Sequence, residues 1–329
     1  MKGKWFSKIA FFALAAFIPV FAQAEKKVVI IAGLGGEEVF QKRFAAESEQ
    51  LYRVLQEQFG YKPEDLILLA SPSDSLAVPA QANDAATIRS VFKKLASELG
   101  EDSELLVFLI GHGSFDGEWA RFNIPGPDLR DVDFSGMLDR LRVSKLLFVN
   151  SSSASGPFVE KLSRNGRVLI TATRNGIERN ATHFFSHLLA TLEHASEADL
   201  NKDGMLSATE LFINTRDRLV KYYSEQGILR PEHPLLEDDG DGEGTETPDI
   251  LKGDGAVASR FFLQQSRGDR VAASETGRTP VQVSAAQKKI LARVEKLQSR
   301  KSTMPEDQYY REFERLMLEL ARLNSQQKK

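Results

Sequence analysis

Short, continuously apolar runs alternate with longer amphipathic stretches along residues 26–195. We expect the apolar runs to form strands at 26–34, 65–71, 104–113, 144–150 and 166–173. We expect the amphipathic stretches to form helices at 37–60, 86–100, 134–143 and 183–195. Strands that are apolar on both faces are typical of a parallel sheet covered by helices on both sides. The sequence therefore predicts an α/β fold, doubly wound, with a mostly parallel sheet of about six strands.

The N-terminal residues have the pattern of a secretory signal. Lys2, Lys4 and Lys8 give a basic start, and the apolar run 9–22 is too short for a comfortable membrane span. The segment Ala-Gln-Ala at 22–24 then matches a signal peptidase site. We expect residues 1–24 to be removed and the mature protein to be exported, to the periplasm or the extracellular medium. An uncleaved N-terminal anchor is the alternative, and no membrane span is expected after signal removal.

The remaining chain divides into one large domain and a C-terminal appendage. Residues 25–262 carry the strand and helix alternation, whereas 263–282 are polar, contain Gly and Pro, and indicate a linker. Residues 283–329 contain two amphipathic segments, which predict a helical hairpin. Its apolar positions are Ile290, Val294, Leu297, Tyr309, Phe313, Leu316, Met317 and Leu320. We favour packing of this hairpin against the domain, with partner binding or self-association as the alternative.

Composition excludes two classes of function. The chain has 43 Lys and Arg against 46 Asp and Glu, a formal net charge of −3, without a basic stripe interleaved with aromatic residues. We therefore expect no nucleic-acid binding. The chain contains no cysteine, which excludes a thiol nucleophile and a thiolate metal site.

Polar, reactive side chains follow two neighbouring strands. His112 stands between Gly111 and Gly113 after the strand at 104–110, and the sequence VNSSSASG at 149–156 follows the next strand. Carboxyl ends of parallel strands share one edge of the sheet, about 5 Å apart, so an imidazole and a hydroxyl could meet there. The amide of Gly113 could face a developing oxyanion. The alternative is that the serines form a small-residue turn that lets a helix pack closely.

This arrangement resembles the caspase-fold cysteine peptidases, nearest the legumain-type branch. Their pattern is an apolar strand followed by His-Gly, then an apolar strand followed by Asp-x-Cys-x-Ser-Gly. The resemblance places His112 at the catalytic histidine, Ser153 at the nucleophilic cysteine and Ser151 at the aspartate. The stretches 121–129, 166–173 and 197–244 are similar to a bacterial exported subgroup, so the resemblance covers most of residues 25–262.

The missing thiol leaves three hypotheses for function. The first is a catalytically impaired pseudo-peptidase that binds peptide or protein, because a serine hydroxyl needs a contacting base and a group that orients the base. The second is an active serine hydrolase in which Ser153 attacks an acyl carbonyl, His112 is the base, and the amides of Gly113 and Ser153 stabilise the oxyanion. Asp116 or Glu118 could then lie near His112. The third is a calcium-dependent envelope or matrix structural protein assembled through the hairpin.

The segment DLNKDGMLSATE at 199–210 matches an EF-hand-type calcium loop at every constrained position. Its expected ligands are Asp199, Asn201, Asp203, the carbonyl of Met205, Ser207 and the bidentate Glu210. All of these are hard oxygen donors, so we expect structural Ca²⁺, with a solvated turn as the alternative.

The other candidate metal ligands are less specific. The acidic stretch 237–244 begins like a metal loop, but Pro248 stands where the closing acid is needed, so a flexible acidic loop is expected. For His183, His187 and His233 we expect ordinary packing roles.

Overall fold

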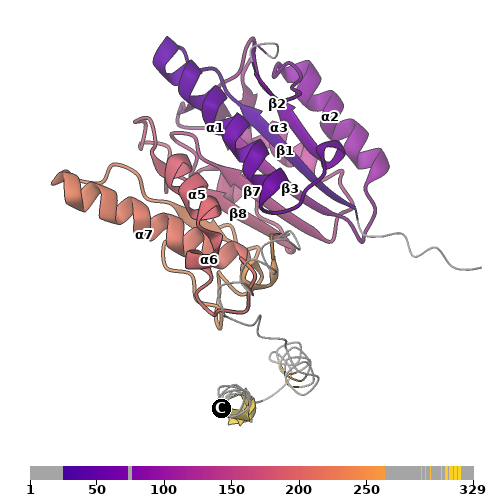
Figure 1. Cartoon of the computed structure of the whole chain (residues 1–329), viewed down its shortest axis with the longest axis vertical. Helices are drawn as coiled ribbons and strands as arrows, with labels where there is room; N and C mark the ends of the chain where they lie inside the picture. The colour runs from indigo at the N-terminus through magenta and orange to yellow at the C-terminus, as the bar shows by residue number, and fades with distance from the viewer. Residues whose placement is uncertain are drawn as a thin grey trace, which may run out of the picture.

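The fold was analysed in a computed structural model that describes residues 25–72, 76–263 and separate positions between 290 and 319 (Figure 1). The signal at 1–24 and most of the linker and hairpin lie outside the described residues. Within the described part of the chain, no helix is long and apolar enough to cross a membrane.

A six-stranded, mostly parallel sheet forms the centre of the domain. Its strands are β1 (Lys26–Ala32), β2 (Leu66–Leu69), β3 (Glu104–Ile110), β7 (Lys145–Asn150), β8 (Arg167–Thr171) and β9 (Leu235–Glu237). They lie in the order β2-β1-β3-β7-β8-β9; the first five are parallel, and β9 is antiparallel to β8. This confirms the predicted α/β class and the mostly parallel sheet.

Helices cover both faces of this sheet (Figure 1). One face packs on α1 (Glu38–Glu57), α5 (Phe184–Glu193) and α7 (Ala208–Gln226), and the other on α2 (Ala85–Glu98), α3 (Asp131–Leu138) and α4 (Phe158–Leu162). Alternate residues of each strand face opposite layers, as Val28 and Ile30 do against Val29 and Ile31. The central residues of the parallel strands are apolar because both of their faces are buried, which is the pattern that the sequence showed.

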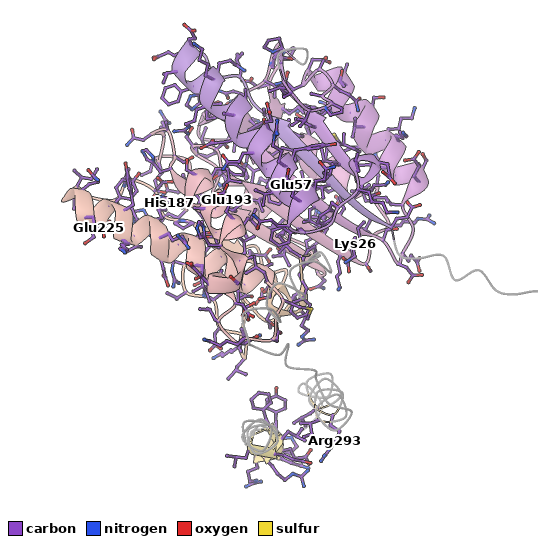
Figure 2. All side chains as sticks on the ribbon, viewed as in Figure 1. Lys26, Glu57, His187, Glu193, Glu225 and Arg293 are labelled. Carbon is purple, nitrogen blue, oxygen red and sulfur yellow. The ribbon has the colours of Figure 1, made fainter. Side chains whose placement is uncertain are left out.

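Two helices of the first layer are also joined by polar contacts. Gln50 of α1 hydrogen-bonds to Glu193 of α5, and the Ser186 hydroxyl donates to Glu47. Figure 2 shows Glu193 and His187 on α5, next to α1 and α7. These contacts fix α5 across α1, above the sheet.

Several elements differ from the sequence prediction. A small antiparallel sheet of β4 (Gly113–Phe115), β5 (Ala120–Phe122) and β6 (Leu129–Arg130) is inserted after β3, and its strands are too short to show a periodic pattern. Helix α3 was predicted at 134–143 but spans 131–138, because Asp133 accepts from the amide of Arg130 and caps it. The remaining short elements are η1 (Pro63–Asp65), α6 (Ala195–Ala198) and η3 (Ala258–Arg260).

Single bridges cover the outer sides of both edge strands. Leu236 of β9 exchanges two backbone hydrogen bonds with Thr245, at 2.9 and 2.8 Å. At the opposite edge, Gln81 pairs alongside β2, donating to Leu68 and accepting from Ala70. Both covering residues belong to loops that turn back along the sheet.

In the C-terminal region, the described apolar side chains Ile290, Leu297, Tyr309 and Leu316 are buried in one cluster. Arg293 and Glu319 form an ion pair at 3.2 Å between the two segments. These contacts agree with two amphipathic segments that pack on each other, and docking of this hairpin on the domain stays a prediction.

Candidate functional site

The candidate site lies at the carboxyl ends of β1, β3, β7 and β8. The connection after β1 leads to β2 on one side of the sheet, whereas the connection after β3 leads to β7 on the other side. Such a reversal is where parallel α/β sheets bind ligands. His112 follows β3 and the serine turn follows β7, so the structure brings both to the predicted edge.

The His112 ring packs toward helix α1. Its centroid lies 4.7 Å from that of Phe40 and 5.0 Å from that of Phe44, both edge-on, and the ring hydrogen-bonds to the backbone of Gly35. Burial lowers the pKa of His112 below its usual value, and the positive charge of Arg43 lowers it further. Glu37 and the Gly35 backbone act in the opposite direction. Burial and Arg43 thus favour the neutral form of the imidazole.

Ser153 uses its hydroxyl for backbone contacts with Gly113. The amide of Gly113 donates to Ser153 Oγ at 3.1 Å, and the same hydroxyl donates to the Gly113 carbonyl oxygen at 3.0 Å. Only 2% of Ser153 is exposed. A Cβ on residue 113 would lie 2.5 Å from the carbonyl oxygen of Ser153, so this approach requires glycine. The residue that follows, Ala154, has a left-handed φ of 52°, which makes the turn sharp.

The other serines of the turn also make buried structural contacts. Ser151 Oγ donates to the Leu109 carbonyl at 2.6 Å, and Ser152 Oγ donates to Asn150 Oδ1 at 2.7 Å. Ser155 Oγ accepts from two amides at the end of β8, those of residues 172 and 173. The run of serines therefore joins the ends of β3, β7 and β8.

His112 and Ser153 lie at the same edge of the sheet, but no hydrogen bond joins their side chains. Within residues 25–72 and 76–263, the His112 ring is hydrogen-bonded to neither Ser153 nor a carboxylate. Asp116 instead accepts from the amides of Glu118 and Trp119 and pairs with Arg121. These contacts hold the pKa of Asp116 well below its usual range. The Asp116 carboxylate is thus engaged in contacts within its own turn.

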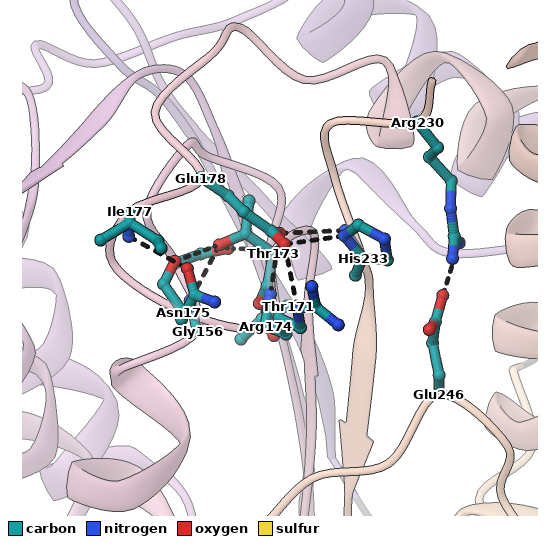
Figure 3. Close-up of polar contacts among 11 residues, drawn as sticks. Gly156, Thr171, Thr173, Arg174, Asn175, Ile177, Glu178, Arg230, His233 and Glu246 are labelled. Carbon is teal, nitrogen blue, oxygen red and sulfur yellow. Dashed lines mark hydrogen bonds and ion pairs between the residues drawn. The ribbon is translucent and has the colours of Figure 1, made fainter. Parts of the chain in front are cut away.

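Sequence reasoning missed a histidine–carboxylate pair behind the serine turn (Figure 3). His233 Nδ1 lies 2.7 Å from Glu178 Oε1, and Glu178 Oε2 accepts from the amides of His233 and Arg174. The Glu178 carbonyl accepts from the amide of Ala154. Glu178 therefore joins the loop after β8, the segment before β9 and the serine turn; no sequence motif marks it.

Arg43 is a second residue that the sequence did not single out. Its guanidinium lies over the rings of Phe40 and Phe44 and donates to the Thr182 carbonyl at 2.9 Å. The Thr182 hydroxyl in turn donates to the carbonyl of Ser151. This chain of contacts connects α1 with the serine turn.

Large apolar side chains are exposed on the loops at this edge. Leu34, Val39 and Ile177 are 43%, 63% and 77% exposed. The first two lie in or next to the β1–α1 loop and Ile177 lies in the β8–α5 loop, so they flank the region of His112 and Ser153. An edge with such side chains offers contacts to an apolar partner.

The EF-hand-type loop forms a compact turn between α6 and α7. Asp199 accepts from the amides of Asp203 and Gly204, at 3.2 and 2.9 Å, and Asn201 Oδ1 accepts from the amide of Asp203. Glu210 accepts from both the amide and the hydroxyl of Ser207. Burial raises the pKa of Asp203, and Asp199 and Glu210 raise it further. Lys202 and Gly204 have positive φ of 58° and 83°, which bends the loop tightly.

A separate acidic cluster could hold a metal ion. Glu237, Asp239 and Asp254 each offer a carboxylate oxygen, and these oxygens lie within 4.8 Å of one another. Burial raises the pKa of Asp254 to about 7, and the charges of Asp239, Asp238 and Glu237 add to this. A metal loop in this stretch needs its closing acid where Pro248 stands, whereas the third carboxylate comes from Asp254, farther along the chain.

Comparisons with known proteins do not assign a family to this chain. No family model matches the sequence, and no curated protein matches it at a significant level. A crystal structure of a structural-genomics protein from Geobacter sulfurreducens is similar, with 13% identity and a TM-score of 0.42 over 72% of this chain and 97% of the other. The mixed sheet of this chain is compatible with a caspase-like fold.

Proposed function

We propose that this protein is an exported pseudo-peptidase of the caspase-fold class, nearest the legumain-type branch, that binds an extended peptide or protein segment without cleaving it. Ser153 supports this proposal most directly. The resemblance assigns its hydroxyl to the nucleophile, but this hydroxyl is nearly buried and is held by both backbone groups of Gly113. Attack on a carbonyl would break these two bonds.

The base is also separated from the hydroxyl. His112 is held by the Gly35 backbone and by two aromatic rings, whereas serine catalysis requires an imidazole that contacts the hydroxyl. The Gly113 amide, which would stabilise an oxyanion, already donates to Ser153. All three parts of the acyl-transfer machinery are thus engaged in other contacts.

Binding would use the surface around this edge. The exposed Leu34, Val39 and Ile177 provide apolar contacts on both sides of His112. A peptide with apolar side chains, laid across the carboxyl ends of the strands, fits this distribution. Ca²⁺ bound by residues 199–210 would stabilise the start of α7, since Glu210 lies in its first turn.

Selection from a displayed random-peptide library tests the binding. We expect peptides with apolar residues to be enriched on the mature chain and to lose at least tenfold in affinity on Ile177→Asp. Leu229→Asp is the matched control, because Leu229 is 95% exposed on the segment after α7. Equal affinity for both variants and the wild-type chain would refute this edge as the binding surface.

A second candidate function is serine-type hydrolysis, favoured by the position of His112 and Ser153 after the neighbouring parallel strands β3 and β7. In that case a fluorophosphonate probe labels the wild-type chain, and Ser153→Ala abolishes labelling. The pseudo-peptidase proposal expects no labelling of the wild-type chain. Amidase activity in Ser153→Cys would show that the rest of the site is intact and lacks only the thiol.

A further inference from the structure

The last residue of β9, Glu237, has a buried carboxylate oxygen that accepts no hydrogen bond from the part of the chain that the structure describes. Glu237 is completely buried, and its Oε1 accepts from the Ser163 hydroxyl at 2.8 Å and from the Gly240 amide at 2.7 Å. Within residues 25–72 and 76–263, no hydrogen bond of normal geometry reaches its Oε2. A buried charged group left in this way is costly, which implies that something else compensates for it.

Two more carboxylates converge on Glu237. Oxygens of Glu237, Asp239 and Asp254 lie within 4.8 Å of one another. Asp254 Oδ1 is fixed by the amide of Asp238, and Asp239 Oδ1 by the amide of Asp241. The backbone thus holds three carboxyl groups together, where repulsion between their charged forms would otherwise separate them. A depression of about 300 Å³, lined by Asp239, Asp241, Glu243, Asp249 and Asp254, opens next to them.

We propose that Glu237, Asp239 and Asp254 bind a divalent cation, Ca²⁺, at a site separate from the loop at 199–210. Ca²⁺ takes oxygen ligands at about 2.3–2.6 Å, so opposite ligands lie roughly 4.6–5.2 Å apart. The three oxygens fit within that diameter, and carboxylate oxygens are the ligands that Ca²⁺ prefers. The exposed Asp239 leaves room for water ligands.

The ion would fasten the acidic segment to the start of α7. Asp238, between two of the ligands, accepts from the amides of Gly255 and Ala258, and the Thr209 hydroxyl donates to the Gly255 carbonyl. The chain then pairs with the end of the EF-hand-type loop, where Leu263 donates to Leu206. A cation held by Glu237 and Asp254 therefore closes a connection between β9 and residues 206–209.

Calorimetric titration of the chelator-treated mature chain with CaCl₂ tests the site. We expect Asp254→Asn to lose one equivalent of calcium relative to the wild-type chain, because Asn keeps the bond from Asp238 but loses the charge. Asp241→Asn is the matched control: it lines the same depression, lies outside the three ligands, and should bind as the wild-type chain does. Equal calcium uptake in Asp254→Asn and the wild-type chain would overturn the proposal, as would a wild-type chain that binds no calcium at millimolar concentration.

Glu210→Gln separates this site from the EF-hand-type loop. If the loop also binds calcium, Glu210→Gln and Asp254→Asn each lose one equivalent and the double variant loses both. If the loop does not bind, Glu210→Gln binds as the wild-type chain does, and Asp254→Asn still loses its equivalent. The two proposals can thus fail independently.

The Tm of Glu237→Gln gives a second test of the site. Relative to the wild-type chain, we expect the variant to have a higher Tm in chelator and to lose the rise in Tm that calcium causes. In chelator, the amide can donate to the neighbouring carboxylates and replaces the unpartnered oxygen, so we expect Tm to rise by about 2–4 °C. Measured in a Glu210→Gln background, so that the loop at 199–210 does not contribute, calcium at a hundredfold excess over Kd should raise Tm by about 5–10 °C when Glu237 is present and should not raise it in Glu237→Gln. A variant that keeps the full calcium-dependent rise would contradict the assignment.

Discussion

Nδ1 of His233 lies 2.7 Å from Oε1 of Glu178, and the other oxygen of this carboxylate accepts two amides, including that of His233 itself. The pair joins segments that are far apart in the chain, because His233 precedes β9 and Glu178 follows β8. It lies directly behind the serine turn, through the bond from the Ala154 amide to the Glu178 carbonyl.

We expect Glu178→Ala to lower the free energy of unfolding by about 2–3 kcal/mol, because two amides and an imidazole lose their acceptor in a mostly buried position. Urea denaturation measures this change. Glu38→Ala is the control: its ion pair with Lys42 is largely exposed, so a change within about 0.5 kcal/mol is expected. Equal effects of both substitutions would show that Glu178 does not hold these segments together.

Ser153→Ala should destabilise the fold even without any effect on catalysis. The substitution leaves the amide and the carbonyl of Gly113 without their partner, which costs about 1–3 kcal/mol in a buried position. Ser97 in α2 is exposed, so Ser97→Ala should be neutral or slightly stabilising by helix propensity. Chemical denaturation that shows no loss for Ser153→Ala would mean that its hydroxyl is free, which favours the hydrolase hypothesis.

The lowered pKa of His112 predicts that the free energy of unfolding decreases in mild acid. Its pKa in the folded state is lowered, mainly by burial, below the unfolded value near 6.5, so the folded state prefers the neutral ring. This contribution is complete above pH 6.5 and is lost as pH falls through the folded-state pKa. The free energy of unfolding between pH 7 and 5 should therefore fall less steeply in His112→Gln. NMR titration of the ring that gives a midpoint above 6.5 would contradict this sign.

The proposed signal at residues 1–24 predicts that the mature protein starts at a defined residue. Expression of the full chain in a bacterial host with a secretory pathway should yield protein that starts at Glu25, as measured by intact mass. Ala24→Tyr should block processing because the position before the cleavage site requires a small residue, whereas Gln23→Ser should be processed normally. Wild-type protein that keeps residues 1–24 would support the anchor alternative.

The sequence predicted the sheet because its strands are buried on both faces, so Val28 through Ile31 are all apolar even though alternate residues face opposite layers. It also placed His112 and Ser153 at one edge, since both follow parallel strands. The sequence could not predict where the two side chains point, because each is turned toward a partner that only the fold provides. Ser153 contacts the Gly113 backbone, and His112 packs on α1.

Other features depend on tertiary closure and have no local signal. Strand β9 is only three residues long, and the pattern of apolar residues did not separate it from the acidic stretch that follows. Asp254 becomes a neighbour of Glu237 only when the chain folds back along β9. The pairing of Glu178 with His233 arises in the same way.

The bridges that cover β2 and β9 have a consequence for aggregation. An open strand edge presents unpaired amide and carbonyl groups to any other extended chain, and such edges promote aggregation. Here Gln81 and Thr245 form hydrogen bonds with backbone groups at the two edges of the sheet, beside β2 and β9. The segment that carries Thr245 thus also protects the edge of β9 from aggregation. If this segment moved away from β9, the backbone of Leu236 could pair with a strand of another molecule.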